Sequence, residues 1–113
     1  MEEKLRRLKE YLNMETELPF ADFEAFWREV LGDLQQNYEG MSRADRLRAA
    51  YICEIVGGNA GARARKEKGH AKSFRKMADK GRFWQEAIKH RLHKEGASDA
   101  EIEAETAELL ERA

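Results

Sequence analysis

The sequence predicts an all-α fold, arranged as a single domain of about five helices that spans residues 1–113 and includes one long basic helix. The 113 residues contain one proline and few β-branched residues, a composition that disfavours β-sheets. Apolar residues recur at intervals of three and four in every segment, as on one face of an amphipathic helix, and no segment alternates with a period of two. A chain of this length can bury one core but not two.

The first two helices are expected on either side of Pro19. Residues 2–13 place three leucines at helical spacing, and the stretch that follows is expected to be a break, because proline disfavours helical backbone at the residue before it. A second helix then carries a broad apolar stripe from Phe23 to Tyr38, and Gly40 is expected to end it.

A third helix is expected to begin after Ser42, whose hydroxyl can cap the first turn, and to end at the Gly57–Gly58 pair. A turn at Gly57–Gly61 would give the third and fourth helices the outline of a helix-turn-helix unit. Residues 62–68 offer only alanine as an apolar contact, which is too little for a recognition helix to pack on its partner. The helix-turn-helix interpretation is therefore disfavoured.

The fourth helix is expected to be the long basic one, over residues 60–95 with Asn59 as its cap, and about 50 Å long at 1.5 Å per residue. Phe83 lies opposite the apolar stripe of this helix, which indicates either a kink near Gly81 or an exposed aromatic ring. Gly96 is expected to end the helix, and a fifth helix follows. Its first residues, Ser98 to Glu101, match the capping-box pattern.

Charge is unevenly distributed along the chain. The formal net charge is −1, yet residues 62–94 contain twelve Lys and Arg against three Asp and Glu. Residues 1–61 contain eight bases and twelve acids, and residues 95–113 contain one base and seven acids. Such segregation indicates an electrostatic partner, which lies either on another molecule or within this one.

Nucleic acid is the first candidate partner, because a basic helix face can neutralise a row of phosphates. An aromatic ring among those bases could stack on an unpaired nucleobase. The sequence therefore predicts a non-enzymatic accessory protein that contacts the nucleic-acid backbone through residues 62–94. The residues predicted to make these contacts are Arg65, Lys68, Lys72, Arg75, Lys76, Lys80 and Phe83.

Two alternatives place the partner elsewhere. The acidic C-terminal helix could shield the basic one, with Glu101, Glu105 or Glu108 in ion-pairing reach of residues 80–91. Alternatively, the chain could be an assembly or adaptor subunit that pairs with another protein or with itself. The second half of the chain has few large apolar residues, so the interface predicted for a homodimer or larger assembly comprises Phe74, Met77 and Trp84.

Several functional classes lack support in the sequence. Cys53 is the only cysteine, which excludes an intramolecular disulfide, and its apolar neighbours indicate a core residue rather than a nucleophile. The three histidines lie in one charged segment, and His90 and His93 match no metal-binding spacing. We therefore expect no enzymatic activity, metal or cofactor. No long apolar run is present, so we expect a cytoplasmic protein without membrane contact.

Overall fold

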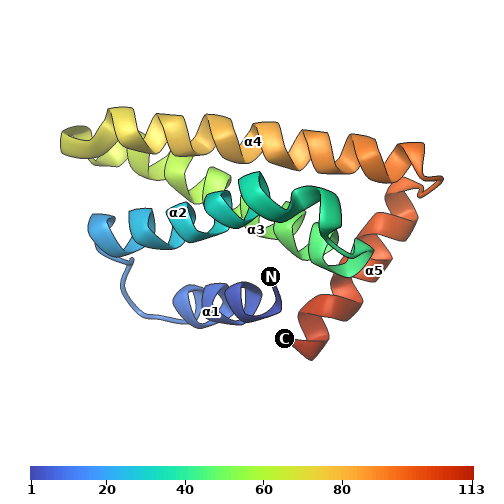
Figure 1. Ribbon diagram of the computed structural model, residues 1–113. Coiled ribbons are helices and arrows are strands. Elements are labelled where there is room, and N and C mark those ends of the chain that lie inside the picture. The colour runs from blue at the N-terminus through green and yellow to red at the C-terminus, as the bar shows by residue number, and fades with distance from the viewer.

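The computed structural model describes residues 1–113 and confirms the all-α prediction (Figure 1). No strand is present. The α-helices are α1 (Glu2–Leu12), α2 (Phe20–Asn37), α3 (Arg43–Lys66), α4 (Ala71–Lys94) and α5 (Asp99–Arg112). Two short 3-10 turns, η1 (Tyr38–Gly40) and η2 (Lys68–His70), lie between α2 and α3 and between α3 and α4.

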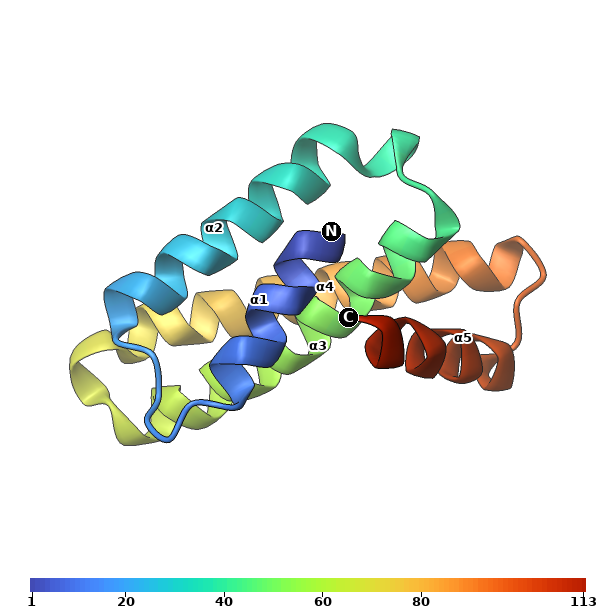
Figure 2. The same cartoon turned by 90° about the horizontal axis from the view of Figure 1, so that it is seen from below.

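Helix α3 is the centre of the arrangement. It forms an antiparallel hairpin with α4, and α1, α2 and α5 each also contact it (Figures 1 and 2). Helix α2 reaches α4 as well, through aromatic contacts of Phe20 and Phe23 with Phe74, and η1 reaches α4 through a contact between Tyr38 and Trp84. Helix α5 crosses the first half of α3 and buries Ile102 and Leu109 there.

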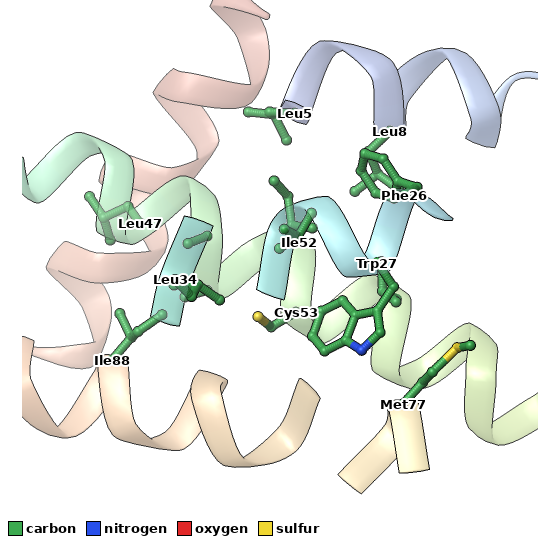
Figure 3. Packing of buried hydrophobic residues seen from close by; sticks show 14 of the residues in the cluster. Leu5, Leu8, Phe26, Trp27, Leu34, Leu47, Ile52, Cys53, Met77 and Ile88 are labelled. Carbon is green, nitrogen blue, oxygen red and sulfur yellow. The ribbon is translucent and has the colours of Figure 1, made fainter. Parts of the chain in front are cut away.

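The core is one cluster of 21 buried residues to which all five α-helices contribute. Figure 3 shows Leu5 and Leu8 of α1 and Met77 and Ile88 of α4 on opposite sides of a layer from α2 and α3. Cys53 lies inside this layer with no exposed surface, and burial raises the pKa of its thiol to about 12. A thiol with so high a pKa is not a nucleophile near neutral pH.

Local signals set several helix ends as predicted. The Ser42 hydroxyl accepts a hydrogen bond from the Asp45 amide at 3.1 Å. Ser98 and Glu101 form the complete reciprocal capping box at the start of α5. Gly96 adopts a φ of +97°, a left-handed conformation that favours glycine and lets the chain turn between α4 and α5.

The predicted boundary between the third and fourth helices was wrong. Helix α3 continues through Gly57 and Gly58 to Lys66, and α4 begins at Ala71, so the expected helix over residues 60–95 is two helices. At 24 residues, α4 is about 36 Å long rather than about 50 Å. Packing of α3 against α4 outweighs the helix propensity lost at glycine, which is about 1 kcal/mol per residue. The helix-turn-helix outline disappears with that boundary.

Candidate nucleic-acid interface

The outer face of α4 carries a strip of exposed side chains, Lys72, Lys76, Lys80 and Phe83. Because α-helical residues four apart lie on the same side, the three lysines follow one another at intervals of about 6 Å along the axis. The buried face of α4, with Phe74 and Ile88, points the other way into the core. The helical periodicity thus gathers these four predicted site residues on one surface.

The other three predicted bases lie beside this strip. Arg75 is exposed on α4, and Lys68 is exposed on η2 at the end of the hairpin. Arg65 belongs to the last turns of α3, not to the helix that carries the lysines. It lines a groove between α3 and α4 together with Arg82. The break at η2 therefore separates Arg65 from the strip.

None of these six basic side chains has an acidic partner within ion-pairing distance in this chain, and all six are exposed. Other bases of the same segment are paired. Lys66 Nζ lies 2.8 Å from Glu17 Oε1, and Arg91 Nη1 lies 3.2 Å from Glu39 Oε2. The positive charge of the predicted site is therefore left to the solvent, whereas that of Lys66 and Arg91 is neutralised within the chain.

Shielding of the basic helix by α5 is not observed. Glu105 pairs instead with Arg43 of α3, with Oε2 2.6 Å from Nη2. Glu108 pairs with Arg112 of its own helix, and Glu101 is engaged in the capping box. The internal-shielding prediction was wrong because α5 docks across α3 through its apolar face, away from the outer face of α4.

Phe83 is the exposed aromatic ring among these bases, with 63% of its surface accessible. Helix α4 runs without interruption through Gly81, so Phe83 faces solvent because of its helical phase and not because of a kink. Its ring meets Trp84 edge-on at a centroid distance of 5.8 Å, and Trp84 packs in turn against Tyr38 at 5.5 Å. One face of an anchored ring is a surface on which a nucleobase can stack.

Two acidic side chains interrupt the basic surface. Asp79 and Glu86 are exposed on α4, one turn before and one turn after Phe83. Helix α4 nevertheless contains eight Lys and Arg against these two acids. The exposed surface of α4 therefore carries a strong net positive charge, and the two acids lower that charge locally around Phe83.

The predicted protein interface requires a correction. Phe74 is completely buried and Met77 is 5% exposed, both in the core of this one chain, so neither offers a surface to a second chain. Trp84 is half-buried against Tyr38. The second half of the sequence has few large apolar residues, but aromatic residues of α2 pack against the start of α4 and bury its apolar face there.

Arg82 is a candidate site residue that the sequence analysis missed. It is exposed, has no ion-pair partner, and lines the same groove between α3 and α4 as Arg65, although it lies closer to Gly57. If residues 60–95 formed a single helix, Arg65 would lie on the same face as the lysine strip. Arg82 would then have no second basic side chain beside it. Only the hairpin brings these two residues to the same groove.

Other chemistry has little geometric support. His93 Nε2 lies 2.6 Å from Asp99 Oδ1, but no group of three His, Cys, Asp or Glu side chains converges to hold a metal ion. None of the helices combines the length and apolar character needed to cross a membrane. No protein-family model, curated protein or solved structure matches this chain.

Proposed function

We propose that this protein binds the backbone of nucleic acid, without reading its sequence, through the outer face of α4. One observation carries the proposal: the six predicted bases, together with Arg82 and Lys94, are exposed on and beside α4 and have no acidic partner in the chain. Proteins usually attract phosphates with Lys and Arg side chains that have no acidic partner and that lie together in one positively charged patch. The proposal assigns no catalytic step to the protein.

Phe83 favours a single strand as the ligand. An exposed ring within the lysine strip can stack on a base only where that base is unpaired. A duplex would contact the lysines alone. The proposal places the protein in the cytoplasm, where a lone thiol such as that of Cys53 remains reduced.

The first experiment removes the lysine strip. A triple variant with Lys72→Ala, Lys76→Ala and Lys80→Ala is compared with wild type in binding to single-stranded DNA, duplex DNA and RNA across a salt titration. For single strands each lost phosphate contact should flatten the slope of log K against log salt by about 0.7. We therefore expect the variant to bind more weakly at low salt and to have a slope flatter by roughly 2.

A matched control removes the same formal charge elsewhere. Arg6, Arg28 and Arg112 are exposed on α1, α2 and α5, and their triple alanine variant should keep most of the affinity and nearly all of the slope. An equal loss in both triple variants would mean that only net charge matters. Wild-type protein that binds none of the three nucleic acids at low salt would contradict the proposal outright.

The second experiment tests stacking. Phe83→Ala should weaken binding to single strands by about 1–3 kcal/mol and leave duplex binding nearly unchanged. Phe83→Tyr keeps an aromatic ring and should behave as wild type. Equal effects of Phe83→Ala on single strands and duplex would show that the ring does not stack on bases.

A further inference from the structure

A groove follows the seam between α3 and α4 on the side that α1 and α2 leave uncovered. Its first part, about 340 Å³, has a floor of small residues that includes Gly57, Gly58 and Gly61. Its second part, about 510 Å³, is bounded by α5. Glu54 and Gln85 line both parts, so the two parts adjoin at these residues, and no lining residue comes from α1 or α2.

The two ends of this groove carry opposite charge. Arg65 lines the end near η2, and Arg82 lies further along the groove, beside Gly57. Neither arginine has an acidic partner within ion-pairing distance, although Glu54 also lines this part of the groove. At the other end α5 contributes Asp99 and Glu103, next to Lys89 of α4. Glu103 is exposed and unpaired, whereas Asp99 contacts His93.

These charges cannot meet within one chain. The basic end lies at Arg65 of α3, and the acidic end lies beside Tyr51 of the same helix. Fourteen residues of rigid helix separate the two positions, which is about 21 Å at 1.5 Å per residue. Side chains at the two ends cannot bridge that distance.

We propose that the groove is the interface of a homodimer, in which a second copy of this chain lies antiparallel to the first. A two-fold axis near Gly58, midway along α3 between Arg65 and Tyr51, would bring the basic end of each copy against the acidic end of the other. An interface about such an axis is self-complementary, so every contact occurs twice. Arg65 and Glu103, which have opposite charges and no partner in their own chain, would thereby be paired twice in the dimer.

The centre of the groove fits this arrangement. A Cβ added to Gly58 would meet nothing within 4 Å in its own chain, so the backbone of α3 is open to close approach there. Acidic α5, raised at one end of the groove, would lie beside the basic end of the second copy.

The dimer is independent of the proposed nucleic-acid function. Lys72, Lys76 and Phe83 point about a quarter turn of helix, or more, away from Ala78 and Lys89, which line the groove. The lysine strip of each copy would stay exposed. Of the six predicted bases, Arg65 alone would pass into the interface, and Arg82 would lie there with it.

The test uses charge reversal and mixing. Arg65→Glu and Glu103→Arg each place like charges together at both symmetry-related contacts, so each variant alone should self-associate roughly tenfold or more weakly than wild type. In an equimolar mixture the heterodimer has one restored wild-type contact and one swapped contact, both attractive. We therefore expect the mixture to dimerise nearly as well as wild type, as measured by sedimentation equilibrium at low salt.

A steric test runs in parallel. Gly58→Gln adds a side chain that its own fold can accommodate but that would occupy the centre of the groove, and the variant should be monomeric. Gly32→Gln is the matched control, because Gly32 also lies in a helix with nothing within 4 Å of an added Cβ and lies outside the groove. The control should dimerise as wild type does.

Three outcomes would overturn the proposal. Wild-type protein that stays monomeric up to on the order of 1 mM at low salt, far above the range of a specific dimer, has no such interface. Single variants that dimerise like wild type, or whose mixture does not recover, would show that Arg65 and Glu103 do not meet. Monomeric protein in which Arg65→Glu abolishes binding to single-stranded DNA would make the groove a polyanion site.

Discussion

Gly57 and Gly81 face each other where α3 and α4 pack together, and the backbone of α3 at Gly57 occupies the space that a side chain on Gly81 would need. A Cβ on Gly81 would lie 3.2 Å from Cα of Gly57 and 2.9 Å from the carbonyl oxygen of Cys53. The latter distance is shorter than a Cβ contact in folded proteins, and the obstacle is backbone that cannot move aside. The closeness of the hairpin therefore depends on the absence of one methyl group.

We expect Gly81→Ala to lower the free energy of unfolding by about 1–3 kcal/mol, because α3 and α4 must separate to admit the methyl group. Gly58→Ala is the matched control on the same pair of helices. Its Cβ meets nothing within 4 Å, so that variant should gain up to about 1 kcal/mol from helix propensity. Urea unfolding followed by circular dichroism measures both. Equal effects in the two variants would show that the close packing is not required.

Arg63 joins the end of the hairpin to α2. It is 6% exposed, and its guanidinium carbon lies 4.7 Å from the ring centroid of Phe74 while Nε contacts Glu67 at 2.6 Å. We expect Arg63→Ala to destabilise the fold by about 2–4 kcal/mol, because packing against the ring is lost together with the buried charge contact. Lys66→Ala, which removes an exposed ion pair, should cost less than about 1 kcal/mol in the same unfolding assay.

Acid should weaken the fold through carboxylates that accept hydrogen bonds from arginine. Hydrogen bonds from Arg7 lower the pKa of Glu29 below its usual 4.5, and those from Arg63 do the same for Glu67. A carboxylate with a lowered pKa in the folded state contributes stability that is complete above pH 4.5 and is lost as the pH falls through the folded value.

We therefore expect the free energy of unfolding to fall below about pH 4.5 and the Glu29→Gln variant to show a shallower fall. Urea titrations at a series of pH values from neutral to strongly acidic measure this slope. Glu10→Gln, on the exposed surface of α1, is the control and should leave the slope unchanged. An identical slope in wild type and Glu29→Gln would contradict the role given to the Arg7 contact.

Cys53 should report opening of the core. Its thiol is buried, and burial raises its pKa to about 12, so alkylation of the native protein near neutral pH should be slow. We expect iodoacetamide to label wild type at a rate set by unfolding and to label Gly81→Ala faster. Mass spectrometry follows the modification. Rapid labelling of wild type at the rate of an unfolded control would contradict the buried position of Cys53.

The sequence by itself determined those features that depend on neighbouring residues. Ser42 and the Ser98–Glu101 box mark helix starts because the cap is made with an amide three residues away, and Gly96 marks a turn because of its own φ. The all-α class and the buried stripe of α4 follow from periodicity for the same reason.

Only the tertiary structure decided where α3 ends and which charges remain unpaired. Glycine pairs usually end helices, yet Gly57 lies mid-helix because Gly81, distant in sequence, packs on it. Arg63 and Arg65 are two residues apart and both basic, but one is buried against Phe23 and Phe74 and the other faces the groove. The helix propensity of a residue is worth about 1 kcal/mol. Packing between helices adds many contacts between residues that are distant in the sequence, and a local sequence pattern does not reveal these contacts.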